Sequence, residues 1–277
     1  MTEIPFIKMH GLGNDFVVID GRSGQVACGM RFDQNKVKSI ADRRTGIGCD
    51  QFIVVEDPRV EEADAFMRIY NSDGGEVHAC GNATRCVGSL LLGEKNKEKV
   101  FIETNVDLLE VESKSRGEIT ANMGLPKFDW EDVPLRSETD TLYLSLDQGP
   151  LSNPSAVNVG NPHVTFFVEK ADTIDLASLG PIIENNSIFP ERANIGIAEI
   201  VSSSYIRLRV WERGVGITLA CGTAACAAAV NGYRRKLTQR KVIIGMDGGE
   251  LSVDWNSNGQ IYMTGPVAKS FLGQLLD

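Results

Sequence analysis

The 277-residue chain contains 42% hydrophobic and 23% charged residues, a balance typical of a folded protein with a packed core. Its length suits one large domain or two medium ones. A net charge of −9 at pH 7, without a long basic run, argues against nucleic acid or an anionic membrane as a partner. The chain has neither a secretory-signal pattern at its start nor the ~18 apolar residues of a membrane span. We therefore expect a cytoplasmic protein with no membrane and no nucleic-acid partner.

Short apolar or alternating runs predict strands through the first half of the chain. In chain order they are Phe16–Asp20, Gln51–Glu56, Ala65–Asn71, Lys99–Thr104, Leu108–Glu112 and Glu118–Met123. The segment Cys80–Leu92, CGNATRCVGSLLL, breaks this pattern because it is apolar on most sides. Such a segment is typical of a buried helix.

The second half repeats these elements after residues 124–140, whose two prolines and many charges predict a linker. Its predicted strands are Ala156–Gly160, His163–Val168, Asn194–Val201, Tyr205–Glu212, Lys241–Met246, Glu250–Trp255 and Gln260–Thr264. The segment Cys221–Tyr233, CGTAACAAAVNGY, is again apolar nearly all round and predicts a second buried helix.

Three pairs of similar segments, in the same order in each half, indicate a duplication. RIYNSDGGEVHACGNA (68–83) aligns without a gap on RVWERGVGITLACGTA (209–224). Upstream, GNDFVVI (13–19) resembles GNPHVTF (160–166), and near the end of each half ITANMG resembles IYMTG. We therefore predict a mixed α/β (α+β) fold of two pseudo-symmetric halves, each a mostly antiparallel sheet around a central buried helix, with the active site in the cleft between them.

Six cysteines with no Cys-x-x-Cys pair, and no zinc-type spacing to histidine, indicate neither a disulfide scaffold nor a metal site. Four of them are predicted to be small buried side chains: Cys28, Cys49, Cys86 and Cys226. Cys80 and Cys221 differ because each stands where a strand and turn give way to a helix. Unpaired N–H groups and the helix dipole at such a position lower a thiol pKa and attract carboxylates.

Two thiols facing each other across one bound group suggest a specific reaction. One thiolate removes the proton α to a carboxylate, and the opposite thiol returns a proton to the other face of the carbon. The surrounding polar side chains suit an amino acid, since Arg213 offers a fork for a second carboxylate and Glu212 can accept an ammonium group. The uncharged members of this set are Asn14, Gln51, Asn71, Asn82, Asn161, Asn194 and Thr223.

Several segments together resemble the diaminopimelate epimerase family, in that family's order and over nearly the whole chain. They are KMHGLGNDFVVID (8–20), GIGCDQ (46–51), NSDGGEVHACGNATRC (71–86), GNPHVTFFV (160–168), FPERANIG (189–196) and WERGVGITLACGTAACAAAV (211–230). The resemblance implies a cofactor-independent epimerase that interconverts LL- and meso-diaminopimelate for lysine and peptidoglycan synthesis. It also implies that the C-terminal strand returns to the first half, which gives halves 1–123 plus 266–277 and 124–265, and that the protein is a homodimer.

By the same resemblance, Cys80 and Cys221 match the acid/base pair, and His163 and Glu212 match positions that tune the protonation of these cysteines. The implied substrate contacts are Asn14, Gln51, Asn71, Gly81, Asn82, Asn161, Asn194, Glu212, Arg213, Gly222 and Thr223. No metal or cofactor is implied. Two positions depart from the family pattern: Ile217 stands where Glu is frequent, and Ala224 where Gly is common. Both bear on the hydrogen bonding behind Cys221.

The residues leave other interpretations open. A related proline or hydroxyproline racemase would share the two thiols, with less need of Arg213 and Glu212. A non-catalytic amino-acid binding protein would not need both cysteines. A thiol-redox enzyme would use them as a disulfide pair. A nucleotide-binding interpretation of the Gly-x-Gly pairs is disfavoured because the first precedes a strand and the second lacks a third glycine.

Overall fold

The computed structural model of the protein describes residues 3–77, 80–115 and 117–276. Backbone contacts divide the chain into two compact units, Met1–Ala121 with Gly265–Asp277, and Asn122–Thr264. His78 and Ala79, which belong to the predicted repeat, lie outside the described residues. Within the described part of the chain, no helix combines the length and the apolar character that a membrane crossing requires.

The first unit is built on one sheet in the order β17-β1-β2-β3-β4-β6-β7-β8, with short β5 paired to the end of β4. The strands are β1 (Glu3–Gly11), β2 (Asn14–Asp20), β3 (Gln51–Glu56), β4 (Ala65–Asn71), β5 (Glu76–Val77), β6 (Lys99–Glu103), β7 (Leu108–Ser115), β8 (Glu118–Asn122) and β17 (Ala268–Leu276). Only the β2–β3 and β4–β6 pairings among these are parallel.

The second unit has a sheet in the order β9-β10-β11-β12-β14-β15-β16, with short β13 paired to the end of β12. Its strands are β9 (Ser155–Asn158), β10 (Pro162–Val168), β11 (Asn194–Ser202), β12 (Tyr205–Glu212), β13 (Gly216–Thr218), β14 (Lys241–Met246), β15 (Gly249–Trp255) and β16 (Ile261–Pro266). The parallel pairings are β10–β11 and β12–β14.

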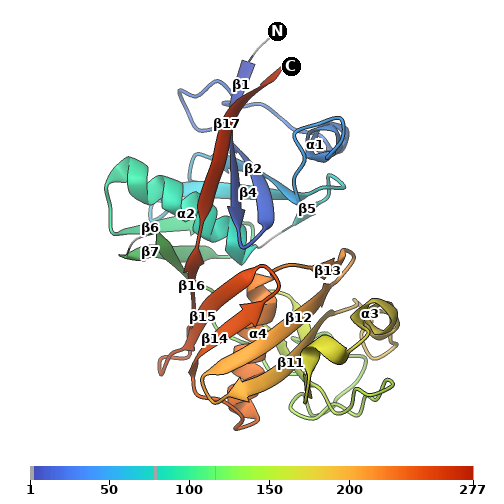
Figure 1. The fold of residues 1–277 in the computed structure, drawn as a ribbon. Coiled ribbons are helices and arrows are strands. Elements are labelled where there is room, and N and C mark those ends of the chain that lie inside the picture. The colour runs from blue at the N-terminus through green and yellow to red at the C-terminus, as the bar shows by residue number, and fades with distance from the viewer. Residues whose placement is uncertain (1–2, 78–79, 116, 277) are drawn as a thin grey trace. The chain divides into compact units, whose positions relative to one another are not determined.

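The two sheets therefore have the same strand order and the same pattern of parallel and antiparallel pairs from β1 to β8 and from β9 to β16. This correspondence confirms the predicted duplicated fold. The first unit has one additional strand: β17 pairs antiparallel with β1, from Glu3 opposite Leu276 to His10 opposite Ala268, and the two run side by side in Figure 1.

Each unit contains one central helix, α2 (Gly81–Lys95) in the first and α4 (Gly222–Arg234) in the second. All residues of α4 from Gly222 to Gly232 are buried, as are those of α2 from Gly81 to Gly88. The helix α2 packs so closely on β7 that a Cβ atom on Gly88 would lie 2.4 Å from Val111 Cγ1. Burial on all sides explains why so few charges occur in either helix.

The sequence patterns did not predict two further helices, α1 (Gln34–Ala41) and α3 (Leu176–Glu184). Both are short, and each begins after an aspartate whose side chain accepts a backbone N–H of the first turn: Asp33 for α1 and Asp175 for α3. They occupy equivalent places in the two units, between the first two parallel strands. A short 3-10 helix, η1 (Ala171–Thr173), precedes α3.

Candidate active site

Cys80 and Cys221 each stand immediately before the first residue of a central helix, with extended backbone at the cap. The first helical hydrogen bonds run from Thr84 N to Cys80 O at 2.9 Å and from Ala225 N to Cys221 O at 3.0 Å. The predicted location of both thiols at helix N-termini is therefore observed. Gly81 and Gly222 follow the cysteines as first helical residues, and neither has a side chain that could cover the N-terminal N–H groups.

In the first unit, Cys80, Asn14 and Asn82 come together. Asn14, the first residue of β2, has its Oδ1 atom 3.9 Å from Cys80 Sγ. The same oxygen accepts a hydrogen bond from Asn82 Nδ2 at 3.2 Å. Three of the predicted site residues thus form one cluster at the start of α2.

Two charged residues that sequence reasoning did not single out set the direction of these amides. Asn14 Nδ2 donates to Asp50 Oδ2 at 3.0 Å, and Arg85 NH2 donates to Asn82 Oδ1 at 2.6 Å. A carboxylate can only accept and a guanidinium can only donate, so both amides have one satisfied orientation. That orientation turns Asn14 Oδ1 toward Cys80. Arg85 could have been found from the sequence, because it is an arginine within an otherwise apolar predicted helix.

Asp50 is in turn held by a cluster of charged residues that includes Asp15, the neighbour of Asn14 in the chain. Its backbone N–H donates to Asp15 Oδ1 at 2.9 Å, and Arg43 bridges the two carboxylates. Lys8 lies 2.6 Å from Asp15 Oδ2 and also bonds Gly48 O. Burial by itself raises the pKa of Asp15, but the hydrogen bonds from Arg43 and Lys8 outweigh it and hold the pKa below its usual range. Asp15 is therefore ionised at neutral pH.

Gln51 and Asn71 form a second pair in the same unit. They are directly opposite each other on β3 and β4, and Gln51 Nε2 donates to Asn71 Oδ1 at 3.0 Å. Gln51 also lies opposite Phe16 on β2, two residues from Asn14 in the chain. The pair is thus held by sheet register near the end of β2 where Asn14 lies.

In the second unit, Cys221 is buried, and its Sγ atom lies 3.4 Å from Thr223 Oγ1. Glu212 ends β12, and its Oε1 accepts the hydroxyl of Thr218 at 2.5 Å across the β12–β13 hairpin. Ile217, one of the two departures from the family pattern, is exposed, whereas Ala224 is buried in α4. Thr218, which the sequence patterns did not single out, thus supplies a hydrogen bond next to Ile217.

Arg213 follows Glu212 and is held at both its backbone and its side chain. Its backbone N–H donates to Asn194 Oδ1 at 3.0 Å, and its NH1 donates to Glu191 O at 2.9 Å. Asn194 Nδ2 donates to Pro162 O at 2.9 Å, which fixes the amide with its oxygen toward Arg213. The structure therefore brings Asn194 and Arg213 together, with part of the guanidinium committed to the backbone.

His163 is 1% exposed on β10, with Nε2 2.8 Å from Asn161 Oδ1. An amide oxygen can only accept, so His163 Nε2 is the donor in this contact. Burial, assisted by the charge of Arg213, lowers the pKa of His163 to about 3. His163 is therefore neutral at physiological pH, and its action on the cysteines stays a prediction.

The remaining four cysteines lie elsewhere. Cys49, Cys86 and Cys226 are buried, and burial raises the pKa of Cys49 to about 11 and that of Cys86 to about 12. Cys28 is exposed, so the prediction that it is buried was wrong. It lies in the turn-rich segment between β2 and α1 and not in a strand of the sheet. In the part of the chain described, no three His, Cys, Asp or Glu side chains are placed to hold a metal ion.

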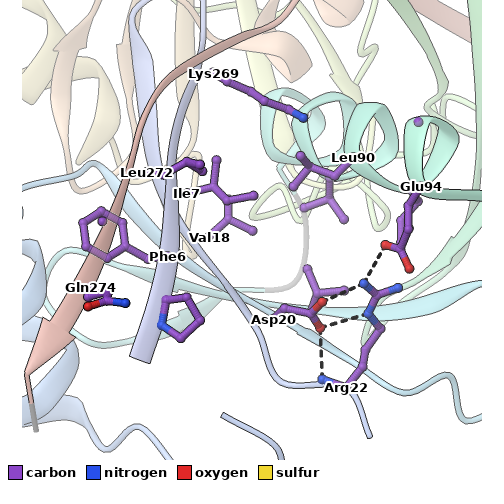
Figure 2. A pocket seen from close by; sticks show the side chains of 16 residues that line it. Phe6, Ile7, Val18, Asp20, Arg22, Leu90, Glu94, Lys269, Leu272 and Gln274 are labelled. Carbon is purple, nitrogen blue, oxygen red and sulfur yellow. Dashed lines mark hydrogen bonds and ion pairs between the residues drawn. The ribbon is translucent and has the colours of Figure 1, made fainter. Parts of the chain in front are cut away.

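A cavity of about 690 Å³ also lies in the first unit, between α2 and the strands β1, β2 and β17. Figure 2 shows its mainly apolar walls, including Ile7, Val18 and Leu90, and the ion pairs of Arg22 with Asp20 and Glu94. None of the predicted site residues lines it. The cavity is thus separate from the cluster around Cys80.

The fold defines a class of two-unit α/β proteins. The solved structure of a hydroxyproline epimerase from Agrobacterium vitis has this fold, with a TM-score of 0.71, covering 99% of this chain and 92% of its own. The two sequences are 13% identical, so this likeness establishes the fold alone.

The family follows from the sequence comparisons. The sequence model of diaminopimelate epimerase matches residues 6–128 and 155–270. The diaminopimelate epimerase of Acidiphilium cryptum is 51% identical over 98% of this chain and 96% of its own length. That of Rhodospirillum centenum is 47% identical over 98% of this chain and 91% of its own length. The chain belongs to the diaminopimelate epimerase family, which confirms the resemblance found in the sequence.

Proposed function

We propose that the protein interconverts LL- and meso-diaminopimelate without a cofactor, using Cys80 and Cys221 as its acid/base pair. The observation that carries the proposal is the location of one cysteine at the N-terminus of the central helix in each of two duplicated units. Family membership supports the substrate. The reaction belongs to the synthesis of lysine and of peptidoglycan precursors, and we place it in the cytoplasm, with a homodimer as the working form.

In the proposed reaction, one cysteine thiolate takes the α-hydrogen of the substrate as a proton. The C–H electron pair moves into the adjacent carboxylate, and an S–H bond forms on that cysteine. The opposite cysteine then gives its thiol proton to the other face of the carbon and becomes a thiolate. No oxidant or reductant is consumed, and the configuration at the carbon inverts.

The helix N-termini supply the charge stabilisation that this reaction needs. The N–H groups that follow Cys80 and Cys221 at the first turns of α2 and α4 are suited to bind a carboxylate as negative charge accumulates on it. Removing one donor of this kind from other enzymes typically costs about 10²–10³ in kcat. A carbon acid as weak as an amino-acid α-carbon requires such stabilisation.

The far end of diaminopimelate carries a second ammonium and a second carboxylate. Arg213 and Glu212 lie on adjacent positions at the end of β12 and offer the opposite charges. A hydroxyproline or proline substrate has no second amino-acid end, so it has no groups for these two side chains to bind. The presence of both residues favours diaminopimelate over the imino acids.

The proposal is tested by adding LL-diaminopimelate, L-proline or 4-hydroxyproline to the wild-type protein and to its Cys80→Ala and Cys221→Ala variants. We expect epimerisation of diaminopimelate only, and a loss of at least about 10³-fold in kcat in each variant because each removes one of the two proton carriers. Cys226→Ala, in the same helix as Cys221, serves as the control and should stay active. Turnover of an imino acid alone, or near-normal turnover in both variants, would refute the proposal.

A further inference from the structure

Glu184, the last residue of α3, is a carboxylate that the proposed chemistry does not use, although it is only 5% exposed. We propose that Glu184 is a positioning residue that fixes the hairpin loop carrying Glu212 and Arg213, and thereby the part of the site that binds the distal end of the substrate. This inference rests on the proposed function, because it concerns the same substrate.

Three donors converge on this carboxylate. Oε1 accepts the backbone N–H of Gly214 at 2.8 Å and Arg192 NH1 at 3.1 Å. Oε2 accepts the indole N–H of Trp211 at 2.7 Å. Both oxygens are therefore satisfied, as a buried charge requires. Two of the three donors, Trp211 and Gly214, flank Glu212 and Arg213 in the chain.

The loop between β12 and β13 is short, and each of its backbone N–H groups has a different acceptor. Arg213 N donates to Asn194 Oδ1 at 3.0 Å, Gly214 N to Glu184, and Val215 N to Glu212 O at 3.0 Å. Glu184 thus holds the central peptide of the loop, at the glycine whose φ of +75° allows the chain to reverse. Without this contact, the hydrogen bonds of Arg213 N and Val215 N would remain on either side of a free Gly214 N–H.

The packing around Glu184 shows that α3 is fitted to this hairpin. A Cβ atom on Gly180, one turn before Glu184, would lie 2.4 Å from the ring of Trp211. Arg192 adopts a left-handed conformation with φ of +60°, next to Glu191, whose carbonyl accepts Arg213 NH1. Through Arg192, Glu184 therefore also anchors the segment that holds the Arg213 side chain.

Loss of the Glu184 carboxylate should weaken binding of the distal substrate end and leave proton transfer at the cysteines intact. In Glu184→Gln the side chain keeps one oxygen, but its NH₂ group faces a donor, so one of the three contacts must break. We expect KM for diaminopimelate to rise about tenfold, with kcat changed less than about threefold and the pH profile of kcat unchanged.

Glu199→Gln is the matched control. Glu199, on β11 of the same unit, also accepts a cationic side chain and a backbone N–H, from Lys170 and Ala171 at 2.7 and 3.1 Å. Lys170 and Ala171 lie outside the β12–β13 loop, so the Glu199→Gln variant should keep the wild-type KM. If KM rises in Glu184→Gln and not in Glu199→Gln, the effect comes from the contacts of Glu184 and not from the loss of any carboxylate that binds a cation.

A folded Glu184→Gln protein whose KM stays within twofold of wild type would overturn the inference, as would a fall in kcat alone. If Glu184→Gln does not fold, Trp211→Phe decides, since it removes the indole N–H donated to Glu184 and keeps an aromatic side chain at this position. A KM raised several-fold in Trp211→Phe supports the inference, and an unchanged KM overturns it. If the wild-type protein does not act on diaminopimelate, the proposed function is refuted as well. If it does, the KM values of the variants test only the inference about Glu184.

Discussion

Two buried ionisable side chains of the second unit are held by different contacts. Three donors surround the oxygens of Glu184. His163 is buried beside the amide of Asn161, and burial favours its uncharged form, lowering its pKa to about 3. The neutral imidazole can hold Asn161 in place over the whole physiological pH range.

The lowered pKa of His163 predicts a loss of stability in mild acid. The unfolded chain binds a proton at this histidine near pH 6.5, whereas the folded chain resists it until about pH 3. The contribution of His163 is therefore complete above pH 6.5 and is lost as the pH falls toward 3. Between pH 6.5 and 5.5 this residue alone should reduce the free energy of unfolding by about 1 kcal/mol.

Urea unfolding at the two pH values measures this effect, with His163→Gln as the comparison because its amide can still donate to Asn161 and does not titrate. The fall in free energy between the two pH values should be about 1 kcal/mol smaller in His163→Gln than in the wild-type protein. Equal pH dependence in both proteins would show that His163 does not titrate as the structure requires.

The sequence predicted those site residues that lie in a distinctive local sequence pattern. Cys80 and Cys221 were recognised because an Ala-Cys-Gly segment precedes an apolar helix in both copies. The long-range contacts of neighbouring residues were not recognised. Asp50 reaches Asn14 across 36 positions in the chain and Glu184 reaches Gly214 across 30, so these pairings arise only from the tertiary fold.

At the scale of elements, periodicity predicted the strands well and the short helices poorly. The predicted strands Gln51–Glu56, Ala65–Asn71, Tyr205–Glu212 and Lys241–Met246 agree with the observed bounds. The helices α1 and α3 were missed because eight or nine residues give a weak periodic signal, and α3 also contains Pro181. The strand β1 was missed because its segment contains a proline, Pro5.

Two glycines of α2 provide a test of how tightly the central helix is packed. Gly88 faces Val111 at a distance too short for a methyl group, whereas a Cβ on Gly93 would meet nothing within 4 Å. Gly88→Ala should lower the free energy of unfolding by about 1–2 kcal/mol, since overpacking outweighs the helical preference of alanine. Gly93→Ala should raise it by about 0.5–1 kcal/mol.

Denaturant unfolding of the two alanine variants measures both changes on the same helix. Because the substitution is identical, helix propensity cancels in the comparison and the difference reports packing against β7. Changes of the same sign and size in both variants would contradict the close packing of α2 described above.

At the scale of the whole molecule, the duplication accounts for the presence of one helix-initial cysteine in each unit. A single unit offers one thiol at one helix N-terminus, which can exchange a proton on one face of a carbon. In the proposed reaction, the equivalent unit, with the same strand order and a second cysteine at the same place, supplies the proton carrier for the other face. The duplication was detectable in the sequence because the segments around both cysteines still align without a gap.

The central claim is that two different groups carry the two protons, and early isotope incorporation from deuterated water tests it most directly. LL-Diaminopimelate is incubated with the enzyme in D₂O, and substrate and product are separated at low conversion. If Cys80 and Cys221 act as opposite acid and base, the meso product carries deuterium at the inverted carbon while the remaining LL substrate stays unlabelled. Deuterium entering the LL substrate as fast as the product would show that one base serves both faces, and would contradict the account.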